Sequence, residues 1–328
     1  MRLIDAAAAQ AALPFDRLIP ALRAMFASGA QVPLRHSHVL RGVAAGGAGG
    51  PGDPSAVTSL LMPAWTLPGQ GSAYYGVKIV NIAPGNAAQG LPGLHASYLL
   101  HDAATGVPLA LIDGDQISAR RTAAASALAA SWLARSDAQQ LLVVGAGRVA
   151  ALLPEAYRVV RDIRRIVVWA RQPLAAQRLA QQWRAQGWDA RAAPDLANAV
   201  AQADIVSCAT LSTAPLVLGR WLRAGSHLDL IGGFTPAMHE ADDDCFKGAA
   251  LFIDTDEALA KAGDLLSPMS RGVFGAADVQ ASLAELCRGL HAGRGSAAGR
   301  TVFKSVGSAL EDLAAAILAY GAEPPGSA

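Results

Sequence analysis

The sequence has little charge of either sign and no long apolar run. Charged side chains make up 16% of the 328 residues and hydrophobic ones 52%, a balance that excludes a disordered chain. The 27 basic and 26 acidic side chains give a net charge of +1 without a basic cluster, which argues against a nucleic-acid partner. No stretch of 18 apolar residues occurs, so we expect no membrane span.

Cysteine is also scarce. Cys208, Cys245 and Cys287 lack the spacing of a disulfide framework or a metal site, so we expect a reducing cytoplasm and no bound metal. Asp5 interrupts the start of the chain before an apolar run develops, which predicts no signal peptide. Alanine is abundant, with 72 residues, and favours packed helices. The length alone predicts two domains.

The first part of the chain has a pattern typical of an antiparallel sheet. A short strand is expected first, then a helix in which Leu18, Leu22 and Phe26 recur at helical spacing, then a flexible glycine-rich loop at Gly46–Asp53. Short apolar runs separated by turn residues predict four strands. These are Val57–Met62, Tyr74–Val80, His95–His101 and Pro108–Ile112, followed by an alanine-rich helix at Arg120–Ala134.

From residue 139 onwards, strands and helices alternate. Apolar strands are predicted at Leu141–Val144, Ile166–Trp169, Asp204–Cys208, His227–Ile231 and Ala250–Ile253. Helices are expected between them, one ending at Gly187 and another beginning at Asp195. Repeated βα units of this kind predict a parallel, doubly wound sheet.

A glycine-rich turn follows the first of these strands. It reads Gly145-Ala146-Gly147-Arg148-Val149-Ala150, with the spacing G-x-G-x-x-A. The first glycine permits a tight turn, the second lets the backbone approach a pyrophosphate, and the helix N-terminus attracts phosphate. Because the turn joins an apolar strand to a helix, we predict a dinucleotide site; the alternative is a glycine turn that binds no nucleotide.

The end of the second strand indicates which dinucleotide is favoured. A carboxylate there would hold the ribose 2′-hydroxyl of NAD, but Trp169 is followed by Ala170 and Arg171. Because Arg171 could pair with a 2′-phosphate, NADP(H) is favoured over NAD(H); the alternative is a solvated surface arginine. Thr210 and Leu211, which follow a later strand, complete the expected cofactor site.

Three blocks of sequence carry a family resemblance. They are Gly76-Val77-Lys78-Ile79-Val80-Asn81, the segment from Ala119 to Ala127, and Thr301-Val302-Phe303-Lys304-Ser305-Val306-Gly307 followed by Glu311-Asp312. Their order and spacing on both sides of the glycine turn resemble the ornithine cyclodeaminase / mu-crystallin family. The resemblance implies an NAD(P)-dependent enzyme that acts on an amino acid or its cyclic imine.

The resemblance also implies an interleaved domain organisation within an α/β fold. A Rossmann-type doubly wound sheet is expected over residues 120–299. A second, α+β domain would combine residues 1–119 with residues 300–328, including the C-terminal helix. This second domain is expected to contact the substrate and to form a homodimer.

The resemblance suggests roles for several charged residues. Arg121 falls where the family binds the substrate carboxylate, which a guanidinium can hold bidentately, and Arg35 matches a second such arginine less securely. Lys78 is expected to contact the substrate and to donate a proton, and Thr122 to help hold a cofactor phosphate. The alternatives are an edge-strand lysine whose charge reaches solvent and an exposed arginine at a helix start. His239 and Glu240 are alternative acid–base groups.

Two positions depart from the pattern of ornithine-specific members. Phe234 stands where those members have an aspartate that works on the substrate amine, and Leu60 stands where they have a glutamate. A phenyl ring neither accepts a proton nor pairs with an ammonium, and an unpaired buried ammonium is costly.

We therefore expect an NAD(P)H-dependent reductase of a cyclic ketimine, as in mu-crystallin-like ketimine reductases, which also lack that aspartate. The substrate would be of the pyrroline- or piperideine-2-carboxylate type, and the product the cyclic amino acid. The alternatives are an ornithine cyclodeaminase, which forms proline and ammonia, and a non-catalytic NADPH-binding protein.

Overall fold

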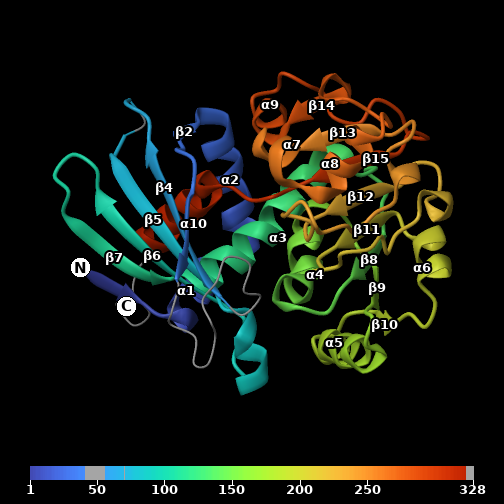
Figure 1. The fold of residues 1–328 in the computed structure, drawn as a ribbon, viewed down its shortest axis with the longest axis horizontal. Coiled ribbons are helices and arrows are strands. Elements are labelled where there is room, and N and C mark those ends of the chain that lie inside the picture. Colours follow the sequence, from blue (N-terminus) through green and yellow to red (C-terminus); the bar gives the residue numbers. More distant parts are fainter. Residues whose placement is uncertain (41–55, 70, 323–328) are drawn as a thin grey trace. The chain divides into compact units, whose positions relative to one another are not determined.

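The computed structural model of the protein describes residues 1–40, 56–69 and 71–322 (Figure 1). The chain forms two compact units. Unit 1 comprises Met1–Ala21, Ser28–Arg121 and Ser308–Ala328, and unit 2 comprises Leu22–Ala27 and Thr122–Gly307. The loop expected at Gly46–Asp53 lies outside the described residues. Within the described ranges, no helix combines the length and the apolarity that a membrane crossing requires.

Unit 1 contains a seven-stranded sheet in the order β1-β7-β6-β5-β4-β2, with β3 also paired to β4. The predicted antiparallel strands are confirmed as β4 to β7, and β1 adds a parallel edge beside β7. β1 itself is only three residues long. The strands are β1 (Arg2–Ile4), β2 (Ala30–Gln31), β3 (His36–Leu40), β4 (Val57–Thr66), β5 (Tyr74–Ile82), β6 (Leu94–Asp102) and β7 (Pro108–Asp113).

The C-terminal helix covers one face of this sheet. α10 (Ala309–Gly321), drawn in red in Figure 1, packs against β4, β5 and β6. Ser308 begins the helix by accepting a hydrogen bond from the backbone N–H of Leu310. The short α1 (Ala6–Ala12) contacts β7 and α10, and α2 (Phe15–Ser28) follows it. The helix expected around Leu18 and Leu22 is confirmed as α2. The sequence does not predict α1, because this helix has no periodic pattern of large apolar residues.

Unit 2 contains an eight-stranded sheet in which every pairing is parallel. Its order is β10-β9-β8-β11-β12-β15-β13-β14, which confirms the predicted doubly wound sheet. The strands are β8 (Gln140–Val144), β9 (Arg165–Trp169), β10 (Ala190–Ala192), β11 (Ile205–Cys208), β12 (His227–Leu230), β13 (Ala250–Ile253), β14 (Val279–Ser282) and β15 (Thr301–Lys304).

One helix boundary and one boundary between the units differ from what the sequence predicts. α3 (Gly114–Leu133) begins six residues before Arg120, because the Asp113 carboxylate accepts the backbone N–H of Gln116 and so starts the helix earlier. The chain leaves unit 2 after Gly307 rather than at residue 299, because β15 pairs with β12 and β13. The segment Thr301–Lys304 therefore belongs to the parallel sheet.

The helices of unit 2 connect consecutive parallel strands, as a doubly wound sheet requires. They are α4 (Arg148–Val160), α5 (Pro173–Ala185), α6 (Leu196–Gln202), α7 (Glu257–Lys261), α8 (Gly263–Ser270) and α9 (Leu283–Cys287). Strand order reverses between β8 and β11, since β9 and β10 lie on one side of β8 and the later strands on the other. Crevices that bind ligands in such sheets form at the carboxyl ends of the strands beside this switch point.

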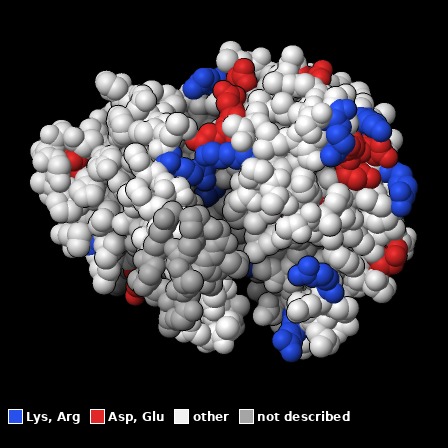
Figure 2. Space-filling model, in the orientation of Figure 1, with Lys and Arg blue, Asp and Glu red and all other residues white. Residues whose placement is uncertain are grey.

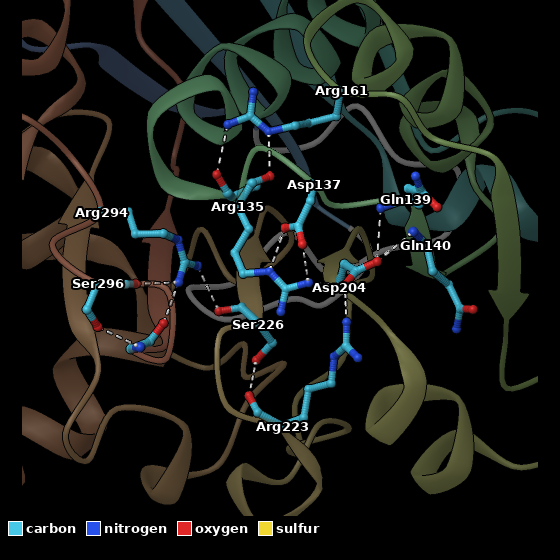
Figure 3. Close-up of polar contacts among 12 residues, drawn as sticks. Arg135, Asp137, Gln139, Gln140, Arg161, Asp204, Arg223, Ser226, Arg294 and Ser296 are labelled. Carbon is cyan, nitrogen blue, oxygen red and sulfur yellow. Dashed lines mark hydrogen bonds and ion pairs between the residues drawn. The ribbon is translucent and has the colours of Figure 1, made fainter.

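An arginine-rich cluster marks the opposite edge of the same sheet, where the parallel strands begin (Figure 3). Asp204, immediately before β11, accepts the backbone N–H groups of Gln139 and Gln140 at 2.9 Å each and pairs with Arg135 and Arg223. Arginines of the cluster also donate to main-chain carbonyls at the end of α3: Arg161 to Ser131 and Ala134, and Arg294 to Leu133. The cluster therefore fixes the end of α3 and the starts of the strands.

Charge on the surface is mixed in sign. Figure 2 shows one face of the molecule, on which basic and acidic side chains lie next to one another and most of the visible surface carries neither. This view agrees with the near-zero net charge of +1.

Candidate functional site

The glycine turn of unit 2 has the geometry that a dinucleotide loop needs. Gly145 follows β8 and has φ +121°, and a Cβ atom there would lie 2.5 Å from the carbonyl oxygen of Ala209. Gly147 caps α4 without a side-chain hydrogen bond, and a Cβ atom there would have no heavy atom within 4 Å. The backbone at the N-terminus of α4 is therefore open to an approaching phosphate, and these residues fit a pyrophosphate group.

The other predicted cofactor residues follow strands of the same sheet. Ala170 and the exposed Arg171 follow β9, and Thr210 and Leu211 follow β11. Arg148 and Val149 begin α4. Because the strands are parallel, these segments all emerge at the carboxyl edge of the sheet, beside the switch point.

Glu240 connects two of the loops at this edge. Its Oε1 accepts the backbone N–H and the hydroxyl of Thr210, at 2.7 Å each, and its Oε2 accepts the backbone N–H of Gly232 at 2.6 Å. Burial raises the pKa of Glu240 to about 7. Both of its oxygens serve as acceptors inside unit 2, so Glu240 joins the loop after β11 to the loop after β12. Phe234 lies in the loop that contains Gly232.

A buried ion pair between Asp264 and Lys304 holds the backbone of Glu240. The Asp264 Oδ1 accepts the backbone N–H of Glu240 at 2.7 Å, and its Oδ2 lies 3.1 Å from the Nζ of Lys304. The side chains of Asp264 and Lys304 are fully buried. The sequence singled out the block that contains Lys304, but only the fold brings α8 beside β15.

A second group of buried charges lies in unit 1 and contains two of the predicted residues. The Nζ of Lys78, on β5, lies 2.7 Å from the Oδ2 of Asp312. Arg121, on α3, donates from Nε to the Asp312 Oδ1 at 2.9 Å and from Nη1 to the Glu311 Oε2 at 2.7 Å. All four side chains are buried. We refer to Lys78, Arg121, Glu311 and Asp312 as the ion cluster.

The secondary structure explains why these charges meet. Lys78 and Val80 alternate with half-buried neighbours on β5 and point to the face that α10 covers. Glu311 and Asp312 lie in the first turn of α10, where the helix dipole favours negative charge. The sequence predicted the two cations but gave no role to the two acids, because their partners are distant in the chain.

Burial and charge act in opposite directions on the groups of the cluster. Burial lowers the pKa of Lys78 to about 8. The repulsion of Arg121 also lowers this pKa, whereas the attraction of Asp312 raises it. Burial by itself would raise the pKa of Asp312, but the charges of Lys78 and Arg121 outweigh it, so the pKa is lowered. At neutral pH the cluster therefore contains an ammonium, a guanidinium and the Asp312 carboxylate, with the ammonium close to its titration range.

Two of the remaining predicted residues, Leu60 and Arg35, lie in unit 1, and Thr122 is the first residue of α3 that belongs to unit 2. Leu60 on β4 is directly opposite Val80, so it shares the Lys78 face of the sheet. Arg35 is half-buried and immediately precedes β3. Thr122 follows Arg121 in α3.

The fold and these sites define a two-unit α/β protein with a dinucleotide-type glycine loop and a separate cluster of buried charges. The chain matches the model of the ornithine cyclodeaminase/mu-crystallin family over residues 58–323, and it belongs to this family.

Several proteins of known name are similar to this chain in sequence and in fold. The Δ1-pyrroline-2-carboxylate reductase of Paracoccus denitrificans is 43% identical over 262 residues, 79% of this chain and 82% of the relative. The solved structure of the Thermococcus litoralis enzyme of that name, in complex with NADH and L-proline, matches with a TM-score of 0.89 at 32% identity, covering 98% and 96% of the two chains. An archaeal alanine dehydrogenase dimer with bound NAD matches with a TM-score of 0.86 at 28% identity, covering 98% and 95%.

Proposed function

We propose that this chain is an NAD(P)H-dependent reductase that converts a cyclic ketimine, of the pyrroline- or piperideine-2-carboxylate type, into the cyclic amino acid. The observation that carries the proposal is the ion cluster, which supplies a buried ammonium and a buried guanidinium. Such a pair suits a small substrate with one carboxylate and one imine nitrogen. The names of the Paracoccus and Thermococcus relatives support this substrate class.

Arg121 binds the substrate carboxylate in this proposal, with Arg35 as its second contact. A guanidinium carries five N–H donors in a planar fork, so one arginine can serve more than one carboxylate. Glu311 and Asp312 hold the guanidinium of Arg121 from one side. Fixing the carboxylate orients the imine carbon for attack.

Lys78 supplies the proton. When bound, NAD(P)H would supply the hydride that the imine carbon receives. The Nζ of Lys78 donates a proton to the imine nitrogen, so that the C=N π bond is replaced by one new C–H and one new N–H bond. Lys78 then recovers its proton from water. A pKa of about 8 keeps Lys78 mostly protonated at neutral pH while letting it give up the proton readily.

The glycine loop and the edge residues of unit 2 would hold the dinucleotide. Gly145, Gly147 and the N-terminus of α4 would receive the pyrophosphate, with Thr122 as a further phosphate contact. We propose a preference for NADP(H), because the exposed Arg171 follows β9 and no carboxylate follows Trp169. The related structures were solved with NADH or NAD, so NAD(H) is the alternative.

We also propose a homodimer formed through unit 1. On the sheet face opposite Lys78, apolar residues stand directly opposite one another across five strands. The row consists of Pro63, Val77, Leu99, Leu111 and Leu3, of which Leu3 is 74% exposed. A continuous apolar row of this kind is typical of a protein interface, and the related alanine dehydrogenase is a dimer. Light scattering should give twice the chain mass, and Leu99→Lys should give the monomer.

Leu60 and Phe234 weigh against the cyclodeaminase alternative. A second ammonium, as in ornithine, would meet apolar side chains where ornithine-specific members are expected to have acids. Retention of both cations in the ion cluster weighs against a non-catalytic NADPH-binding protein.

One set of assays separates the three functions. NADPH and NADH oxidation is followed with pyrroline-2-carboxylate and with piperideine-2-carboxylate, and ammonia release is followed with ornithine and NAD. The proposal expects imine-dependent oxidation and little ammonia. Rapid ammonia release would favour the cyclodeaminase, and cofactor binding without turnover of either imine would favour the binding protein.

A further inference from the structure

We propose that Asp312 is the positioning residue of the substrate site: its carboxylate holds Lys78 in place as the proton donor and fixes Arg121 for the substrate carboxylate. The inference rests on the proposed reductase function and deepens it. It gives a role to the start of the C-terminal helix α10, 191 positions after Arg121 in the chain.

The geometry of Asp312 differs from that of an ordinary surface acid. Its two oxygens contact two different cations: Oδ2 lies 2.7 Å from the Nζ of Lys78, and Oδ1 accepts from the Nε of Arg121 at 2.9 Å. The Asp312 side chain has no exposed surface. One rigid carboxylate therefore sets the distance between the proposed proton donor and the proposed carboxylate-binding group.

Glu311, the next residue, provides a built-in comparison. Its Oε2 contacts the Nη1 of Arg121 at 2.7 Å, so it supports the guanidinium. Asp312 forms ion pairs with both cations, whereas Glu311 forms an ion pair with Arg121. The two acids have nearly the same burial and lie in the same helical turn. Replacing each in turn separates support of Arg121 from support of Lys78.

The charged and titratable groups that face Lys78 come from three elements. Asp312 and Glu311 face it from α10, Arg121 from α3, and the buried Tyr98 hydroxyl from β6, where Tyr98 is the residue directly opposite. Asp312 contributes the largest attraction in this set and opposes both burial and Arg121. Removing its charge should therefore lower the pKa of Lys78 further, and the ammonium should be lost at a lower pH.

The lysine content makes this measurable without an activity assay. The chain contains only four lysines: Lys78, Lys247, Lys261 and Lys304. NMR of side-chain-labelled lysine in the full chain resolves their titrations, and Lys78→Met assigns the signal of Lys78. We expect Lys78 to titrate near pH 8 in the wild type. Its pKa should be roughly one unit or more lower in Asp312→Asn, and the shift should be much smaller in Glu311→Gln.

Kinetics give the second readout. Imine reduction should fall on the basic side as Lys78 loses its proton, and Asp312→Asn should move this limb of the kcat/KM profile to lower pH. Glu311→Gln should leave the limb in place and raise KM for the imine. Asp312→Glu keeps the negative charge but changes its position. Its kcat should therefore fall about tenfold or more, while the basic limb of the kcat/KM profile stays at the same pH. That variant carries the test if Asp312→Asn does not fold.

The outcomes separate the inference from the proposed function. If Lys78 titrates lower in Asp312→Asn but the wild type reduces neither imine, the positioning role holds and the substrate is wrong. If the wild type reduces an imine while Asp312→Asn leaves both the titration and the limb unchanged, Asp312 has no such role. Equal effects of Asp312→Glu and its counterpart Glu311→Asp on kcat would also overturn the inference.

Discussion

Two buried aspartates, one in each unit, are stabilised in opposite ways. Asp312 in unit 1 and Asp229 on β12 in unit 2 are both fully buried, but Asp312 is held by two cations whereas Asp229 accepts from the hydroxyls of Ser126, Tyr157 and Ser207. The pKa of Asp312 is lowered, because its ion pairs outweigh burial. Burial raises the pKa of Asp229 to about 6, since neutral donors offset it only in part.

This difference distinguishes a carboxylate paired with cations from a carboxylate held by neutral hydroxyl groups. Unit 1 keeps charges inside the protein and needs two acids to do so, which is costly for stability unless the charges serve binding or chemistry. Unit 2 uses a carboxylate that can take up a proton to join α3, α4, β11 and β12 through hydroxyl groups. The same residue type therefore acts as a fixed charge in one unit and as a hydrogen-bonding hub in the other.

The largest effect is expected from removing the proposed proton donor. Lys78→Met should lower kcat for imine reduction by roughly 10²–10⁴-fold, the usual contribution of a positioned acid, with cofactor affinity unchanged. Lys247→Met is the matched control, because the Lys247 side chain is exposed and forms an ion pair with the surface acid Asp244. Steady-state kinetics and cofactor titration check both. Wild-type kcat in Lys78→Met would exclude Lys78 as the donor.

Breaking the ion cluster should have the largest effect on stability. Asp312→Asn leaves two buried cations with one acid fewer, so the free energy of unfolding should fall by about 3–5 kcal/mol. Asp162→Asn is the control: Asp162 is 64% exposed and pairs with Arg164, and such a surface pair contributes at most about 1 kcal/mol. Urea denaturation measures both. Similar losses in the two variants would mean that the cluster is not a stabilised set of charges.

The contrast between the two aspartates also predicts a pH dependence. The pKa of Asp229 is raised from 3.8 to about 6 in the folded state, so the fold holds a proton that the unfolded chain has released. Stability should therefore decrease as pH rises from about 4 to about 6, by at most about 3 kcal/mol. The lowered pKa of Asp312 gives the opposite sign: its contribution is present above pH 4 and is lost only in stronger acid.

Asp229→Asn should make the decrease between pH 4 and 6 shallower, and Asp312→Asn should keep it in full. A decrease remains in Asp229→Asn because the pKa of the buried Glu240 is also raised, to about 7. The melting temperature measured across this pH range decides the matter. If the melting temperature of Asp229→Asn changed with pH as in the wild type, neutral hydroxyls would stabilise the ionised carboxylate as well as cations do. The contrast between Asp229 and Asp312 would then disappear.

A smaller effect is expected at the edge of unit 2. Gly147→Ala should leave the fold intact, because a Cβ atom there meets open space, but it should weaken cofactor binding about tenfold by blocking close approach of the pyrophosphate. Gly145→Ala should instead destabilise the fold by about 1–3 kcal/mol, because Gly145 has φ +121° and Ala209 lies in the way. Fluorescence titration with NADPH and thermal unfolding separate the two.

The smallest effect concerns cofactor choice. Arg171→Ala should weaken NADPH binding several-fold and leave NADH binding unchanged, because an exposed arginine contributes little beyond its contact with a 2′-phosphate. Arg178→Ala, an exposed neighbour on α5, is the control. Dissociation constants for both cofactors check the prediction. Equal losses of NADPH and NADH affinity in Arg171→Ala would contradict it.

Local sequence patterns predicted most elements, since β4 to β9 and β11 to β13 have clear apolar runs. α1 escaped prediction because it is short and alanine-rich, and β10 and β14 because they are short and lack an apolar run. Lys78 and Arg121 were found through the family resemblance. The sequence does not predict the contacts of Glu311, Asp312 and Glu240, because these contacts join segments far apart in the chain.

The most direct test of the account follows the hydride into the product. Pyrroline-2-carboxylate is incubated with the chain and with nicotinamide cofactor deuterated at its transferable position, and the product is analysed by mass spectrometry and NMR. The account predicts proline with one deuterium, at the α-carbon, and one cofactor oxidised per proline formed. Recovery of the imine unchanged under these conditions, with ammonia released from ornithine in a parallel reaction, would contradict it.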